Sequence, residues 1–210
     1  MPKTMACNNT GSQIAYEIRV GFSLADVIKL QAEWAADKTA ILQTIIATFG
    51  TQLNDNSFAQ SKLIEYNLSD FNWDWGAKAY HCSSNDYIWF LLIADGKAQG
   101  ACIAFHPKQS KLDGCNIFYI DYIAASYENR DRPGHQRRFS GIGSRLLSYV
   151  TDYANKQFNY RHGFCLHSLP TAEVYYRGLG LTEYPADPAK ENLVYFEACP
   201  TTAARIAGVA

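Results

Sequence analysis

The chain has 210 residues, of which 48% are hydrophobic, 14% aromatic and 19% charged. This composition is typical of a globular protein and excludes intrinsic disorder, collagen and coiled coil as descriptions of the chain. The formal net charge of -1 provides no overall attraction for nucleic acid. A phosphate-bearing ligand therefore needs a local cluster of binding groups.

Cysteine usage and hydropathy bear on the compartment. The cysteines form no C-x-x-C pair, and their spacing fits neither a zinc site nor a small disulfide scaffold. They are Cys7, Cys82, Cys102, Cys115, Cys165 and Cys199. Residues 1–13 lack the apolar segment of a signal peptide, and the longest apolar run, 87–94, is far shorter than the roughly 20 residues of a membrane-spanning helix. We expect reduced core thiols in a soluble, cytoplasmic protein.

The first elements are a strand and two helices. Residues 1–13 are polar, and we expect them to be flexible. Period-two alternation predicts a half-buried strand over residues 14–22. Apolar residues at helical spacing then predict a helix over 24–34, with Ser23 as its N-cap, and a second helix over 39–49.

Residues 51–86 have no sustained period, and we expect an ordered loop in which Phe58–Tyr66 adds one or two helical turns. Aromatic residues gather here with two aspartates between them. They are Tyr66, Phe71, Trp73, Trp75 and Tyr80, with Asp70 and Asp74. Such a cluster either lines a pocket for a cationic amine or forms a satellite core under the loop, and the sequence leaves both open.

The middle of the chain is rich in strands. Asp95-Gly96 between two apolar runs predicts a β-hairpin with strands over 87–94 and 98–106. The run 116–126 is apolar on both faces, which predicts a central strand. An arginine-rich loop follows, and a helix is predicted over 141–158.

The remaining pattern predicts a strand over 163–167, a helix from Pro170 to Leu179 and two closing strands over 181–184 and 193–199. The order is then β-α-α-β-β-β-α-β-α-β-β. It predicts a single α/β (α+β) domain over 14–199, with a mixed central sheet of about seven strands flanked by helices. Residues 200–210 are expected to be a C-terminal tail.

The chemistry centres on Arg138-Phe139-Ser140-Gly141-Ile142-Gly143-Ser144, between the central strand and the following helix. Glycines let the backbone pass close to a bulky ligand. The first helical N–H groups have no intrahelical acceptor, so they favour an anion such as phosphate. Four arginines stand against one aspartate over residues 130–138, a local net charge of +3. A tight turn with solvated arginines is the alternative reading of this stretch.

Two common nucleotide motifs are absent. A dinucleotide fingerprint needs a third glycine three residues after Gly143, where the chain has Leu146. A P-loop needs Gly-Lys-Ser or Gly-Lys-Thr, which does not occur.

Arg138-x-x-Gly141-x-Gly143 after a strand resembles the R/Q-x-x-G-x-G/A pyrophosphate loop of the GNAT superfamily of acyl-CoA-dependent N-acetyltransferases. The segment 172–181, AEVYYRGLGL, is similar to the family's A-x-x-F-Y-x-x-x-G-F, with Leu181 in place of the last Phe. The predicted order of elements also matches. The arginine-rich loop and the segment before residue 86 are longer than in the family.

The resemblance implies acetyl-CoA as co-substrate, no metal, and transfer of acetyl to a primary amine of a small molecule or protein by direct attack. A non-catalytic acyl-CoA-binding module is the alternative, and a phosphate-binding domain of other chemistry is a third. No nucleic acid or membrane partner is expected, and a homodimer is left open. The implied cofactor-binding residues are Ile123, Ala124, Ala125, Arg138, Phe139, Ser140, Gly141, Ile142, Gly143 and Ser144.

For the chemistry, the resemblance implies Tyr176 as the general acid that protonates the departing thiolate; a packed aromatic whose hydroxyl reaches solvent is the alternative. Tyr175 is then expected to face the core, unless the register is shifted by one. Asp121 is the first candidate for the general base, because burial in an apolar strand raises the pKa of a carboxyl. With regular alternation Asp121 shares a face with Ile123 and Ala125, and a structural carboxylate is the alternative. His167, at the end of the next strand, is a second candidate base.

Overall fold

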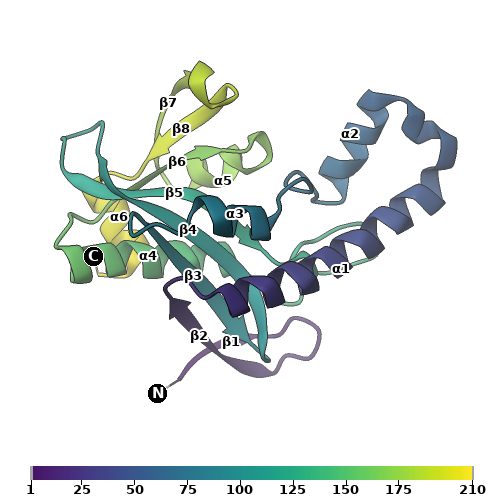
Figure 1. Cartoon of the computed structure of the whole chain (residues 1–210), viewed down its shortest axis with the longest axis horizontal. Coiled ribbons are helices and arrows are strands. Elements are labelled where there is room, and N and C mark those ends of the chain that lie inside the picture. Colours follow the sequence, from purple (N-terminus) through teal and green to yellow (C-terminus); the bar gives the residue numbers. More distant parts are fainter. Residues whose placement is uncertain (1, 210) are drawn as a thin grey trace.

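The computed structural model describes residues 2–209 and contains one mixed sheet with helices on both faces (Figure 1). The eight strands lie in the order β1-β2-β3-β4-β5-β6-β8-β7, with β5 and β6 as the parallel pair. They are β1 (Lys3–Ala6), β2 (Gln13–Val20), β3 (Tyr87–Ala94), β4 (Lys97–Gln109), β5 (Asn116–Ala125), β6 (Phe164–Ser168), β7 (Thr182–Asp187) and β8 (Leu193–Glu197). The predicted fold class is confirmed, with one strand more than expected.

Two cores lie on the two faces of the sheet. The helices are α1 (Leu24–Phe49), α2 (Asn56–Glu65), α3 (Trp75–His81), α4 (Ile142–Phe158), α5 (Glu173–Gly178) and α6 (Pro200–Ala207). The apolar residues of α4 and α6 pack on one face, and those of α1 and α3 pack on the other. Figure 1 shows α2 away from the sheet, at the far end of α1.

Part of the segment before β2 is a strand, where the sequence predicted a flexible segment. Residues 3–6 form β1, which pairs with β2 and buries Met5. Cys7 then bridges to Phe139 of the glycine-containing loop, and the Asn8 backbone N–H donates to the Arg138 carbonyl at 2.8 Å. The first residues therefore help to fix the loop that carries the predicted phosphate site.

The helices before β3 also differ from the prediction. Leu24–Phe49 is one helix of 26 residues rather than two, because residues 35–38 contain neither glycine nor proline to interrupt it. The expected loop over 51–86 contains α2 and α3. Asp74 caps α3 by accepting the Ala77 N–H at 2.8 Å.

The later elements follow the prediction more closely. Asp95 and Gly96 join β3 and β4 with positive φ angles, as the hairpin turn requires. β5 lies between β4 and β6, which confirms it as a central strand. The expected C-terminal tail is instead partly helical, because α6 packs against α4.

β5 carries a bulge at Asp121. Its pairing with β4 slips by one residue between Ile120 and Tyr122, so the alternation of side chains is interrupted. Ile120, Ile123 and Ala125 consequently pack on one face, although regular alternation would place Ile120 opposite the other two. Regular alternation, the condition under which Asp121 would share a face with Ile123 and Ala125, therefore does not hold here.

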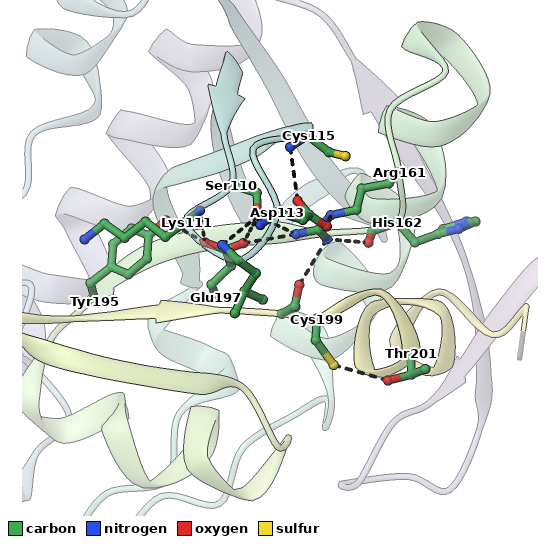
Figure 2. A network of polar contacts seen from close by, with 12 residues as sticks. Ser110, Lys111, Asp113, Cys115, Arg161, His162, Tyr195, Glu197, Cys199 and Thr201 are labelled. Atoms are coloured by element: carbon green, nitrogen blue, oxygen red, sulfur yellow. Dashed lines mark hydrogen bonds and ion pairs between the residues drawn. The ribbon is translucent and has the colours of Figure 1, made fainter.

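A buried carboxylate ties the end of β8 to the β4–β5 connection (Figure 2). Glu197 is fully buried and accepts the Lys111 N–H at 2.9 Å and the Tyr195 hydroxyl at 3.0 Å. The Ser110 hydroxyl and the Arg161 guanidinium also donate to it. Because all of these donors bind one carboxylate, the network joins β8 to the β4–β5 connection, next to the first residues of β5.

We expect Glu197→Gln to lower the free energy of unfolding by about 2 kcal/mol or more, because it removes one of the two carboxylates beside Arg161, the other being Asp113 at 2.7 Å, and turns an NH₂ toward buried donors. Chemical denaturation measures this loss. Glu17→Gln, which removes one partner of the exposed Arg19–Glu17 pair, is the matched control and should change stability by about 0.5 kcal/mol or less. Equal effects of the two substitutions would contradict the role given to the network.

All six cysteines are free thiols. Cys7, Cys82, Cys102 and Cys165 are buried as expected, whereas Cys115 is exposed and Cys199 is half-buried. None of the helices within residues 2–209 combines the length and apolar character that a membrane crossing requires.

Candidate active site

The site is built where the parallel strands β5 and β6 part. Their pairing covers Phe118–Ile120 of β5 and ends at Leu166 of β6. β5 then continues to Ala125, while the end of β6 goes on pairing with β8. The backbone of residues 121–125 is thereby separated from β6 and faces an opening in the sheet.

A cavity of about 460 Å³ lies at this opening. Residues 119–123 of β5 form one wall, and residues 166–168 of β6 with the following Leu169 form another. Side chains from the segment before β3, from α5 and from the β7–β8 connection complete it. These are Asn72, Trp73, Lys78, Tyr176, Lys190 and Glu191, among others.

The two adjacent tyrosines of α5 face different places. Tyr176 is 5% exposed, packs in the core formed with α4 and contributes to the wall of the 460 Å³ cavity. Tyr175 is 40% exposed, and its hydroxyl lies 2.9 Å from the Ser144 hydroxyl. The expectation that Tyr175 faces the core is wrong, because the buried side of this short helix carries Tyr176. Burial raises the pKa of Tyr176, so its hydroxyl keeps its proton at neutral pH.

Asp121 lies on the wall of the same cavity. Burial raises the pKa of its carboxyl, while the charges of Lys190 and Lys78 act in the opposite direction. A carboxylate with a raised pKa is a better proton acceptor than an exposed one. The bulge thus presents an ionisable group to the cavity from an otherwise apolar strand.

A second, smaller cavity of about 180 Å³ lies at the N-terminus of α4. It is lined by Ala125 at the end of β5 and by Gly141, Gly143 and Ser144. Gly141 has a φ angle of 73°, which favours glycine. Among the described residues, the first α4 N–H with a backbone acceptor is that of Arg145, which donates to Gly141 at 3.0 Å. The preceding N–H groups have no intrahelical acceptor, so this end of α4 suits an anion.

Several other predicted cofactor-binding residues are already buried or hydrogen-bonded within the protein. The side chains of Phe139 and Ile142 are buried in the core, so only their backbone can serve a ligand. The Ala125 carbonyl accepts from the Arg130 guanidinium at 2.7 and 2.9 Å. Ile123 and Ala124 remain on the parted stretch of β5.

Three arginines of the cluster are paired with carboxylates, some local and some from distant parts of the chain. Arg130 binds Asp70 with two hydrogen bonds, and Arg137 binds Asp131. Arg138 lies against Asp95 and at 3.5 Å from Glu128. The local charge of +3 is therefore largely compensated, and an anion at α4 depends on backbone N–H groups more than on free arginines.

The aromatic segment divides between the core and the wall of the cavity. Tyr66 and Trp75 are core residues, whereas Trp73 lines the 460 Å³ cavity. Lys78 of α3 lies 3.5 Å from the centre of the Tyr122 ring and 4.6 Å from that of Trp73. Asp70 and Asp74 do not face an amine, because they bind Arg130 and cap α3.

Lys78, Lys190 and Tyr119 are cavity residues that the sequence did not single out. The Asp74 cap was the one available signal for the helix that carries Lys78. No local pattern marks the other two, since their position depends on the parting of β5 and β6. Within residues 2–209 no group of His, Cys, Asp and Glu is arranged to hold a metal ion.

The parted parallel strands, the cavity between them and the glycine-containing turn into α4 define an α/β fold also found among solved structures. An acyl-CoA N-acyltransferase from Pseudomonas aeruginosa is similar at a TM-score of 0.51 and 10% identity, over 88% of this chain and 100% of that one. The GNAT domain of S. lividans PAT is similar at a TM-score of 0.52 and 11% identity, over 94% and 96%. No protein-family model and no curated protein sequence matches the chain. The chain has the GNAT fold, as its two motifs predict.

Proposed function

We propose that the protein is an N-acetyltransferase that moves acetyl from acetyl-CoA to a primary amine. The observation that carries this proposal is the course of β5 after it leaves β6. From the bulge to Ala125, one strand joins the 460 Å³ cavity to the anion-binding turn of α4. A single ligand that lies along β5 can then place its thioester in the cavity and its diphosphate at the N-terminus of α4.

In this proposal the amine nitrogen attacks the thioester carbon directly, and the tetrahedral intermediate expels the CoA thiolate. Tyr176, on the cavity wall, donates a proton to the sulfur. Asp121, on the wall formed by β5, takes a proton from the ammonium form of the acceptor, whose ordinary pKa is about 10.4. Ile123 and Ala124 offer backbone groups to the pantetheine arm. Gly141, Gly143 and Ser144 offer N–H groups to the diphosphate.

The test is release of free thiol from acetyl-CoA in the presence of a panel of primary amines. We expect release that depends on both the enzyme and the amine, and we expect CoA alone to raise the melting temperature. CoA binding without amine-dependent release would favour the non-catalytic module instead. Failure to bind CoA at all would contradict both.

Asp121→Asn supplies a second test, because it removes the base and keeps the shape of the side chain. General acid–base help is worth about 10² to 10⁴ in rate, so we expect a loss of this order near neutral pH. Asp74→Asn, at the cap of α3 outside the cavity lining, is the control and should retain activity. An Asp121→Asn variant with full activity would show that this carboxylate is structural.

A further inference from the structure

Three side chains next to Asp121 form a hydrogen-bonded chain that ends in the cavity. The Tyr119 hydroxyl lies 2.9 Å from Nδ1 of His167, and Nε2 of His167 lies 3.1 Å from a carboxylate oxygen of Asp187. Tyr119 and His167 both line the 460 Å³ cavity, one from β5 and one from β6. Asp187 stands behind them at the end of β7.

The direction of the hydrogen bonds follows from the donors available. A carboxylate only accepts, so Nε2 of His167 carries the hydrogen and donates it to Asp187. Nδ1 of a neutral imidazole is then an acceptor, and the Tyr119 hydroxyl donates to it. Because Tyr119 lines the cavity, its oxygen keeps lone pairs that can accept an N–H from a ligand there.

The pKa of His167 is held below its ordinary value, chiefly by burial, so that its imidazole is neutral at pH 7. Burial lowers the pKa of the His167 imidazole, Asp187 opposes this, and the ammonium groups of Lys190 and Lys111 add to the lowering. The Ala189 N–H and His167 keep the pKa of Asp187 below its ordinary value, so it is ionised. The Tyr195 ring packs at 5.1 Å from the imidazole and limits its rotation.

Acetyl transfer needs a second proton acceptor, and this step of the argument rests on the proposed function. An ammonium and acetyl-CoA become an amide, a thiol and one released proton, so the nitrogen loses two protons and the sulfur gains one. Asp121 is already protonated once it has taken the first. The N–H proton of the tetrahedral intermediate therefore needs another base.

We propose that Tyr119, His167 and Asp187 form a proton relay in which Tyr119 is the catalytic residue that touches the acceptor nitrogen. The nitrogen gives its proton to the Tyr119 oxygen while the Tyr119 proton passes to Nδ1 of His167, and Asp187 stabilises the imidazolium. Asp121 and His167 then release their protons to water, and Tyr176 takes back from water the proton it gave to sulfur, which leaves the one net proton that the reaction releases. His167 and Asp187 act through Tyr119 and are positioning residues.

Asp187→Asn gives a sharp test because the other carboxylate oxygen is fixed. The Ala189 N–H donates to that oxygen at 2.9 Å, so the asparagine keeps its carbonyl there and turns its NH₂ toward His167. The imidazole must then carry its hydrogen on Nδ1, and Tyr119 loses its acceptor. Glu183→Gln makes the same chemical change on the same strand, at an exposed pair with Arg177, and is the matched control.

Two measurements on the full chain separate the outcomes. In ¹⁵N-histidine NMR at neutral pH, we expect His167 to be neutral with hydrogen on Nε2, and to switch to Nδ1 in Asp187→Asn but not in Glu183→Gln. In the thiol-release assay, Tyr119→Phe and Asp187→Asn should lower kcat about 100-fold or more, within the range of acid–base help, with CoA affinity and the activity of Glu183→Gln unchanged.

A wild-type His167 that is cationic at neutral pH, or that carries its hydrogen on Nδ1, would overturn the relay whatever the assay gives. Full activity of Tyr119→Phe and Asp187→Asn, alongside an active wild type, would overturn the relay and leave the proposed function standing. A wild type that binds no CoA would instead count against the proposed function, and the tautomer measurement would still decide the hydrogen-bond chain.

Discussion

Tyr176→Phe should lower kcat for acetyl transfer by about 10² to 10⁴, the range of general acid help. The substitution removes one hydroxyl from the cavity wall and leaves the ring packed against Phe196 in the core. Because the pKa of Tyr176 is raised by burial, the hydroxyl is a donor over the whole neutral range. The loss should therefore be in kcat, measured by thiol release, with the dissociation constant for CoA unchanged.

Tyr149→Phe is the control for loss of a tyrosine hydroxyl. Tyr149 lies on α4, packs against Phe90 and is outside the cavity lining. Its variant should retain activity and melting temperature. If Tyr176→Phe is as active as this control, the sulfur receives its proton from another group, and the role given to Tyr176 is wrong.

Gly143→Glu should weaken CoA binding by at least about 100-fold, because a carboxylate replaces free space next to the expected diphosphate and removes charge-assisted hydrogen bonds, each worth about 1.5 to 3 kcal/mol. A Cβ added at Gly143 meets nothing within 4 Å. Replacing glycine inside a helix gains about 0.5 to 1 kcal/mol, and a negative charge near a helix N-terminus gains about 0.3 to 1 kcal/mol. Folding stability should therefore stay the same or rise while CoA affinity falls.

Gln157→Glu introduces the same charge at the other end of α4, an exposed position roughly 20 Å away at 1.5 Å per residue. Calorimetric titration with CoA should give this control the wild-type dissociation constant. A Gly143→Glu variant that binds CoA as tightly as the control would place the cofactor elsewhere on the molecule.

The elements that the sequence predicted well carry their signal locally. Asp95-Gly96 needs only its own positive φ angles to make the hairpin, and the apolar face of α4 is periodic over its whole length. The two motifs that resemble the GNAT family also lie on short segments around Gly141 and Tyr176. The elements that carry them, a helix after β5 and a short helix after β6, occur in the predicted order.

The features that the sequence did not predict depend on contacts between distant residues. The bulge at Asp121 comes from the pairing of β5 with β4, and no residue type marks it. Asp70 and Asp95, which pair with Arg130 and Arg138, come from other parts of the chain. The charge counted over residues 130–138 alone therefore overestimated the net positive charge at this loop. The contact between Tyr119 and His167 joins residues 48 positions apart and exists only because β5 and β6 are parallel neighbours.

The central claim is that the backbone amides at the start of α4 hold the diphosphate of acetyl-CoA. It is tested most directly by a ¹⁵N–¹H NMR titration of the protein with coenzyme A. We predict saturable shifts of the amides of Gly141, Gly143 and Ser144, with those of residues 156–158 at the other end of α4 unmoved. Saturable binding that leaves the amides of 141–144 unshifted, or no saturable shift at any concentration, would contradict the account.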